Sequence, residues 1–142
     1  MEGFRFIVTI PIRFADLDAV GHVNHATYLS YFEEARSAYY FQLVGGEGVD
    51  RLTFVVAEVG CRYRAPAFYP GRVRVGVRVS EIGQKSFRME YEARDAPSGR
   101  LLAEGHTVLV AYDYARRTSM RVPDEVRRAA ESYEGRKLQS NR

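Results

Sequence analysis

Hydrophobic side chains follow two different periods along this chain, and each period predicts a different element. From Phe4 to Phe14 apolar side chains alternate with others, which predicts a strand with Pro11 at an edge or a bulge. From His25 to Val44 they recur every three or four residues, which predicts a long helix that ends at Gly45. The positions that define the helix are Leu29, Phe32, Ala35, Tyr39 and Leu43.

A period of two returns in the second half of the chain and predicts four more strands. The clearest of them has valine at four alternating positions, with arginine or glycine between. Turns at Gly83-Gln84 and at Pro97-Ser98-Gly99 join it to the strands that follow. We expect an antiparallel meander of Phe54–Arg64, Arg72–Ile82, Ser86–Arg94 and Leu101–Tyr112.

The chain closes with a short helix and a polar segment. Pro123 followed by two acids predicts a helix start, and a polar, frayed tail follows from Gly135. The element order predicts one α+β domain at 1–134, with a tail at 135–142. Its architecture is an antiparallel five-stranded sheet wrapped around one long central helix.

Composition narrows the class of protein without deciding its function. The 142 residues are enough for one domain with a real core. A net charge of +3 is too mild to indicate a dedicated nucleic-acid binder. The single cysteine, Cys61, excludes an internal disulfide. With no signal-peptide pattern and no apolar run of membrane-spanning length, we expect a cytoplasmic protein.

Candidate chemistry concentrates between the first strand and the long helix. Residues 16–25 hold two carboxylates and two histidines. A carboxylate that faces a helix N-terminus can activate a nucleophile while free amides bind a developing anion. Asp18 is the candidate for that carboxylate, whereas Asp16 is more typical of a turn or capping acceptor. His22 is expected to hydrogen-bond within the loop.

The same four side chains, Asp16, Asp18, His22 and His25, also raise the alternative of a metal site. No further cluster of cysteine or histidine supports that interpretation, so we expect no metal and no cofactor. Two other reactive residue types, Cys61 and His106, lie in strand patterns and are expected to be structural.

The motifs resemble those of the hotdog-fold, 4-hydroxybenzoyl-CoA thioesterase-like acyl-CoA thioesterases. The resemblance covers nearly the whole chain. It rests on Asp16-x-Asp18-x-x-Gly21-x-x-x-His25-x-x-Tyr28, on Phe32-Glu33-Glu34-Ala35-Arg36 and on Gln84-Lys85-Ser86-Phe87. It implies that Asp18 is the catalytic carboxylate, and that the backbone N–H near His25 polarises the thioester carbonyl.

The resemblance also implies the remaining parts of the site. Asn24 and Tyr28 are expected to contact the substrate, and Lys85 and Ser86 to lie near the CoA arm. In this family the active site lies between two protomers, so we expect a homodimer or a homotetramer.

The predicted reaction is hydrolysis of a small or medium acyl-CoA to the free acid and CoA. Three alternatives stay open. Asp18 is a general base or a nucleophile; His25 acts through its side chain or its backbone; and the protein is an enzyme or a non-catalytic acyl-CoA-binding homodimer. The arginines at 72, 74 and 78 are a solvated sheet face, a CoA phosphate contact or an oligomer contact.

Overall fold

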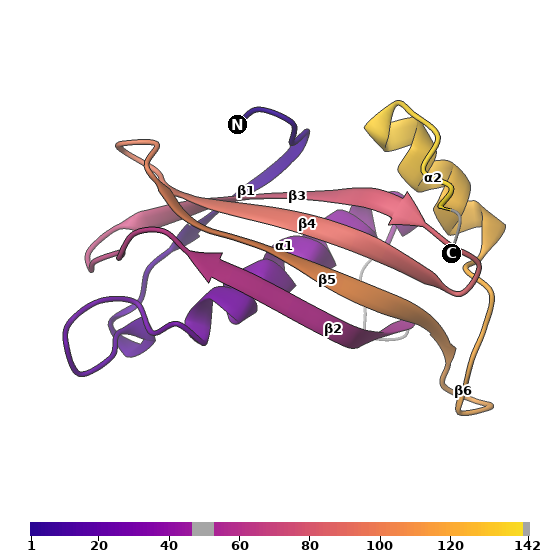
Figure 1. Cartoon of the computed structure of the whole chain (residues 1–142), viewed down its shortest axis with the longest axis horizontal. Coiled ribbons are helices and arrows are strands. Elements are labelled where there is room, and N and C mark those ends of the chain that lie inside the picture. Colours follow the sequence, from indigo (N-terminus) through magenta and orange to yellow (C-terminus); the bar gives the residue numbers. More distant parts are fainter. Residues whose placement is uncertain (47–52, 141–142) are drawn as a thin grey trace.

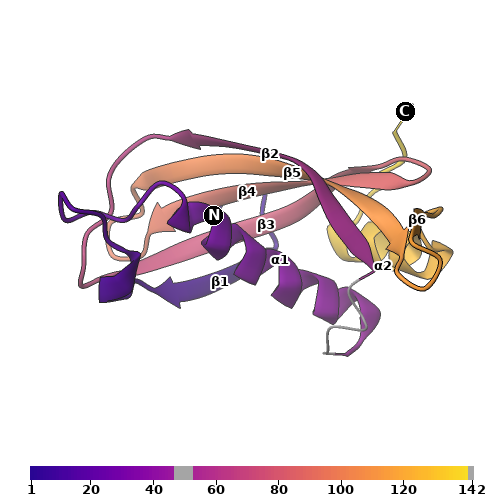
Figure 2. The same cartoon turned by 90° about the horizontal axis from the view of Figure 1, so that it is seen from below.

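The computed structural model describes residues 1–46 and 53–140, and it shows one antiparallel sheet with a long helix lying across one face (Figure 1; Figure 2). The predicted α+β fold is therefore confirmed. Along the chain the elements are β1 (Phe6–Pro11), a short 3-10 helix (Phe14–Asp16), α1 (Thr27–Val44), β2 (Phe54–Tyr63), β3 (Arg72–Ile82), β4 (Ser86–Asp95), β5 (Leu101–Asp113), β6 (Thr118–Ser119) and α2 (Asp124–Glu134).

The order of the strands corrects the predicted four-strand meander. The sheet runs β1-β3-β4-β5-β2, and the two-residue β6 pairs with β5. The part β3-β4-β5 is a meander as predicted, but β2 pairs with β5 at the far edge, where Gly60 faces His106. The reason lies in residues 64–71. These residues connect β2 to β3, which lies three strand spacings, about 14 Å, away across the sheet. The connection is long enough to span that distance, so it is not a tight turn between neighbouring strands.

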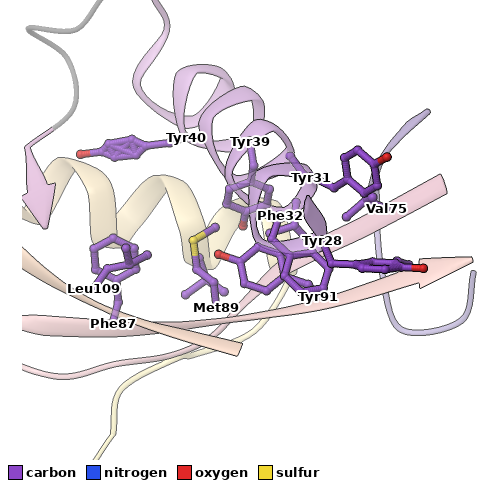
Figure 3. Packing of buried hydrophobic residues seen from close by; sticks show 14 of the residues in the cluster. Tyr28, Tyr31, Phe32, Tyr39, Tyr40, Val75, Phe87, Met89, Tyr91 and Leu109 are labelled. Carbon is purple, nitrogen blue, oxygen red and sulfur yellow. The ribbon is translucent and has the colours of Figure 1, made fainter. Parts of the chain in front are cut away.

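The core lies between α1 and the inner face of the sheet. Val73, Val75, Val77 and Val79 all point inward and are buried. Phe32 of α1 stacks on Tyr91 of β4 with ring centroids 4.7 Å apart, and Figure 3 shows the two rings between helix and sheet. Gly105 of β5 lies beneath Phe32, and a Cβ atom at this position would come too close to the Phe32 ring. The helix therefore sits close to the sheet at this point.

The helix ends as the sequence predicts. Gly45 adopts the left-handed conformation with φ of 72° and donates its N–H to the carbonyl of Phe41. Neither helix within residues 1–46 and 53–140 has the length and apolar character to span a membrane.

The C-terminal tail is more ordered than predicted. Leu138 is buried, and its carbonyl accepts the N–H of Ile82 at 2.6 Å. Ser140 donates its N–H to the Ile82 carbonyl at 2.9 Å, and Leu138 donates its own to a Glu131 carboxylate oxygen at 2.8 Å. The expectation of a frayed tail was wrong, because one apolar side chain in the polar segment covers the end of β3.

Candidate active site

Asp18 lies in a tight loop that uses one of its two carboxylate oxygens. The loop closes through the N–H of Gly21 to the Asp18 carbonyl and the N–H of Asp18 to the His22 carbonyl. Gly21 adopts a φ of 88°, a conformation that glycine accepts without strain. Oδ1 of Asp18 accepts the N–H of Val20 at 3.0 Å and that of His22 at 3.4 Å. Oδ2 lies 3.5 Å from Nδ1 of His22.

The connection between β2 and β3 holds this loop against the sheet. Val23 donates its N–H to the Ala67 carbonyl at 2.9 Å, and His22 forms an isolated β-bridge with Phe68. The rings of His22 and Phe68 meet edge to face with centroids 6.1 Å apart. The position of Asp18 therefore depends on residues almost fifty positions later in the chain.

Asp16, two residues away, is enclosed by donors. Its side chain is only 2% exposed. Oδ2 accepts the N–H of Arg13 at 2.9 Å and the hydroxyl of Tyr31 at 2.8 Å, and Oδ1 accepts the Arg13 guanidinium at 2.9 Å. Burial by itself would raise the pKa of Asp16, but these hydrogen bonds hold that pKa below its usual value. The predicted structural role of Asp16 is confirmed.

The segment before α1 leaves one backbone donor without an acceptor. Asn24 accepts the N–H of Ala26 on Oδ1 and the N–H of Thr27 on its carbonyl, each at 2.9 Å. Within the described part of the chain, the N–H of His25 makes no hydrogen bond. The His25 ring is exposed and lies edge-on to Tyr63 at 6.3 Å between centroids. This turn therefore presents a free amide.

These features meet at an open pocket of about 400 Å³, the Asp18 pocket. It is lined by Asp18, His22, Val23, His25, Tyr28, Tyr63, Arg64, Ala65 and Pro66. Tyr28 is nearly buried and forms edge-to-face pairs with Tyr31 and Tyr63. Burial raises the pKa of Tyr28 to about 12. Its hydroxyl is thus neutral at physiological pH, and the pocket joins one carboxylate to an aromatic wall.

Tyr63 is one of the pocket residues that the sequence analysis missed. Its hydroxyl donates to the His25 carbonyl at 2.6 Å, which ties the end of β2 to the turn before α1. Burial, and to a smaller extent the contact with Cys61, raises the pKa of Tyr63 to about 12. Its place in a strand pattern carried no signal for this role, because alternation does not indicate which strand end meets the helix start.

Two predicted residues lie far from this pocket. Lys85 is exposed just before β4, and Ser86 is the first residue of β4, opposite Val110. At the other end of the sheet, Tyr63 faces Ala103, which faces Ala93. Ser86 precedes Ala93 by seven residues, which is about 23 Å along a strand. Within one chain, Lys85 and Ser86 therefore do not reach the Asp18 pocket.

A wider hollow of about 690 Å³ lies on the outer face of the sheet, and its lining includes the side chains of Arg78, Glu90 and His106. Arg78 bonds the Glu90 carboxylate at 2.7 Å and lies over the Phe4 ring at 4.6 Å. His106 contacts Glu58 at 2.8 Å. Arg78 and Glu90 are thus paired with each other in this hollow, whereas the Asp18 carboxylate and the turn at His25 lie at the Asp18 pocket.

The metal alternative finds no cluster of ligands. Within residues 1–46 and 53–140, no group of three or more His, Cys, Asp or Glu is placed to hold an ion. Asp16 turns into the protein toward Arg13 and Tyr31, away from Asp18. Cys61 is half-buried, and burial raises the pKa of its thiol, which disfavours a thiolate nucleophile.

Comparisons with known proteins agree with this fold. Residues 12–130 match the family model described as the thioesterase-like superfamily. Escherichia coli K12 "Long-chain acyl-CoA thioesterase FadM" is 26% identical over 127 residues, which cover 86% of this chain and 94% of FadM. Bacillus subtilis 168 "Uncharacterized protein YsmA" is 33% identical over 90 residues, but these span only 60% of YsmA and 63% of this chain.

A solved structure from Thermus thermophilus, a thioesterase complexed with coenzyme A and Zn, is similar over the whole fold. Its TM-score is 0.86 at 37% identity, with 97% of this chain and 100% of that chain covered. The family match spans more than half of the chain, and relatives named thioesterases align over most of it. The predicted family is therefore confirmed: the chain belongs to the thioesterase-like superfamily and has the hotdog fold of its enzymes.

Proposed function

We propose that this protein hydrolyses acyl-CoA thioesters at the Asp18 pocket. The observation that carries the proposal is the meeting of two groups in one pocket: the Asp18 carboxylate and the His25 N–H, which has no acceptor in the described chain. A carboxylate and a free amide are what thioester hydrolysis requires, because one activates the attack and the other binds the developing oxyanion. Relatives named acyl-CoA thioesterases support the same reaction.

In the proposed reaction, the thioester carbonyl oxygen accepts a hydrogen bond from the His25 N–H. If Asp18 is a general base, it takes a proton from the water that adds to the carbonyl carbon; the carbon–sulfur bond then breaks, CoA leaves as the thiolate, and the thiolate takes up that proton. If Asp18 is a nucleophile, it adds to the carbonyl carbon itself, CoA leaves as the thiolate, and water then hydrolyses the anhydride to release the acid. Asn24 accepts the Ala26 N–H on its side-chain oxygen and the Thr27 N–H on its backbone carbonyl. The His25 N–H is therefore left for the substrate. Tyr28 and Tyr63 form the aromatic wall against which a small or medium acyl group packs.

Oxygen-18 tests the nucleophilic role of Asp18, because label enters the Asp18 carboxylate in one turnover only if an anhydride forms. If Asp18 is a general base, a single turnover in labelled water places the label in the product acid. If Asp18 is a nucleophile, it forms a mixed anhydride, and water that attacks the aspartyl carbon leaves the label on the enzyme. The product of the first turnover then carries an unlabelled oxygen from Asp18.

A panel of acyl-CoA substrates with a thiol reagent tests the function itself. We expect release of free CoA from at least one aromatic, short-chain or medium-chain acyl-CoA. Binding without turnover across the panel would establish the alternative, a non-catalytic acyl-CoA-binding homodimer. Calorimetry with the same substrates separates that outcome from a failure to bind.

We further propose that the working unit is a homodimer, alone or paired as a homotetramer, in the cytoplasm. β2 ends the sheet, and its outer edge has no strand partner within the described chain. Val56 and Val59 on this strand are 48% and 46% exposed. An open apolar edge favours pairing with another chain. Ser86 lies about 23 Å along β4 from Ala93, at the opposite end of the sheet from the Asp18 pocket, so we propose that Lys85 and Ser86 contact the CoA bound to a second copy.

Mixed dimers test this arrangement. Asp18→Asn and Lys85→Glu homodimers should each have low activity at limiting acyl-CoA. If Asp18 and Lys85 of different copies share a site, a heterodimer of the two variants contains one intact site, and random pairing restores about a quarter of wild-type turnover. No restoration would place both residues in the site from the same copy. Light scattering distinguishes a dimer from a tetramer.

A further inference from the structure

We propose that His22 is a positioning residue, which holds the free oxygen of the Asp18 carboxylate in its reactive orientation. This inference rests on the proposed function, since it assigns a partner to the same carboxylate. Its basis is the placement of His22 between Asp18 and Phe68, in a loop whose own backbone fixes only one side of the carboxylate.

The two oxygens of Asp18 have different surroundings. Oδ1 accepts two backbone N–H groups, so the loop itself holds it. Oδ2 receives no hydrogen bond within the described residues, and His22 Nδ1 lies 3.5 Å from it. That distance is an ion-pair contact longer than a formed hydrogen bond. Catalytic hydrogen bonds are often long in the absence of substrate and tighten when it binds.

The His22 ring is held from behind. Phe68 packs edge-on against it, and the backbones of the two residues form a β-bridge. The neighbouring bond from Val23 N–H to the Ala67 carbonyl fixes the same stretch. These backbone contacts fix the position of His22, and turning its ring away from Asp18 would break the edge contact with Phe68. The hydrogen bonds to Oδ1 leave the Asp18 carboxylate partly free to rotate about its Cβ–Cγ bond, and the His22 ring restricts that rotation.

Two protonation states of the His22 ring carry a proton on Nδ1: the imidazolium cation and the neutral Nδ1–H tautomer. Either state can fill the proposed role. A donor on that nitrogen binds Oδ2 while it is negatively charged and keeps it aimed into the Asp18 pocket. When Oδ2 takes a proton from water, or bonds to the acyl carbon, the same donor can shift toward Oδ1. In the proposed reaction the His25 N–H binds the substrate carbonyl and His22 contacts Asp18, so removing His22 should lower kcat and leave KM nearly unchanged.

The test compares three variants. His22→Ala should lower kcat about tenfold, with unchanged KM and thermal stability, because a misplaced catalytic group costs rate. His22→Asn should restore most of kcat, since the asparagine Nδ2 stands where Nδ1 stood. His106→Ala is the matched control: it removes another histidine–carboxylate contact, 2.8 Å to Glu58 on the outer face, and should leave kcat unchanged.

A second readout does not depend on turnover. In nitrogen-15 spectra of the wild-type protein, the His22 Nδ1 signal should shift on Asp18→Asn substitution while the His106 signals stay in place. Unchanged kcat in His22→Ala, equal loss in His22→Asn, or an unmoved Nδ1 signal would each overturn the role of His22. If the wild type hydrolyses no acyl-CoA, the proposed function fails, and the nitrogen-15 spectra still decide whether His22 holds Asp18.

Discussion

Asp16 and Asp18 are two residues apart, yet the fold gives them opposite environments. Asp16 is enclosed by Arg13 and Tyr31 and is 2% exposed, whereas the Asp18 side chain is 28% exposed and borders an open pocket. Every acceptor position of the first faces a donor, while the second keeps one oxygen without a hydrogen bond in the described structure. The difference teaches that the fold leaves Asp18, and not Asp16, with an oxygen available for the proposed chemistry.

The strongest test of this contrast is the removal of the Asp18 carboxylate. Asp18→Asn removes the base or nucleophile and should lower kcat by about a thousandfold, within the usual range for a general base. Urea denaturation should show nearly wild-type stability, since the loop bonds to Oδ1 survive. Near-normal kcat in this variant would remove Asp18 from the mechanism.

The matched change at the other carboxylate should have the opposite character. Asp16→Asn puts an amide against the donors of Arg13 and Tyr31, and should lower the free energy of unfolding by about 3 kcal/mol. Folded enzyme at low temperature should keep most of its kcat. Urea denaturation and a steady-state assay on the same preparation measure both quantities. A stable but inactive variant would contradict the structural role.

Acid should weaken the fold through Asp16. The pKa of this carboxyl is lower in the folded protein than in the unfolded chain. The charged form therefore stabilises the fold at every pH above about 3.9, and this contribution is lost as pH falls through the folded-state pKa. The stability difference between wild type and Asp16→Asn should thus be full at pH 7 and shrink toward pH 3. A difference independent of pH would exclude the charge as its cause.

The turn before α1 should show an intermediate effect. Asn24→Ala removes the acceptor for the Ala26 N–H and should cost about 1 kcal/mol of stability, as loss of a helix-start acceptor usually does. Asn24→Asp keeps the acceptor and is the control. We expect kcat to fall with Asn24→Ala as well, because the Ala26 N–H then competes for the substrate oxygen. Equal kcat in both variants would argue against that directing role.

The smallest effect is expected from the side chain at position 25. His25→Ala keeps the backbone N–H and should retain kcat within about tenfold of wild type. His25→Pro lacks that N–H and should lose about 3 kcal/mol of transition-state stabilisation, the usual cost of one oxyanion donor. Circular dichroism controls for folding. A large loss in His25→Ala would favour the imidazole as an acid or base.

The sequence predicts most of the fold because each element carries its own periodicity. The valines of β3 and the glycine that ends α1 are local signals, and both appear as predicted. The place of β2 is not local, because alternation predicts a strand but not its neighbour. Leu138 could not be placed either: one apolar side chain in a polar tail is buried only if a surface elsewhere needs covering.

The candidate site likewise has one part that local sequence patterns predict and another that they do not. The Asp16-to-Tyr28 motif indicates the loop and the helix start, because these residues are adjacent in the chain. Tyr63 and residues 64–66 enter the pocket through the crossing from β2 to β3, which no pattern in the sequence indicates. The roles of the predicted site residues in catalysis and substrate binding stay predictions: Asp18, His25, Asn24, Tyr28, Lys85 and Ser86.

The absence of a side chain at Gly105 lets α1 pack close to the sheet at Phe32. A methyl group there would come within 2.7 Å of the Gly60 carbonyl oxygen and 2.8 Å of the Phe32 ring, so strand or helix would have to yield. Tyr28, in the first turn of the same helix, lines the Asp18 pocket, so a displacement of α1 at Phe32 would also alter that pocket. The size of the residue at position 105 therefore bears on a pocket that Gly105 does not line.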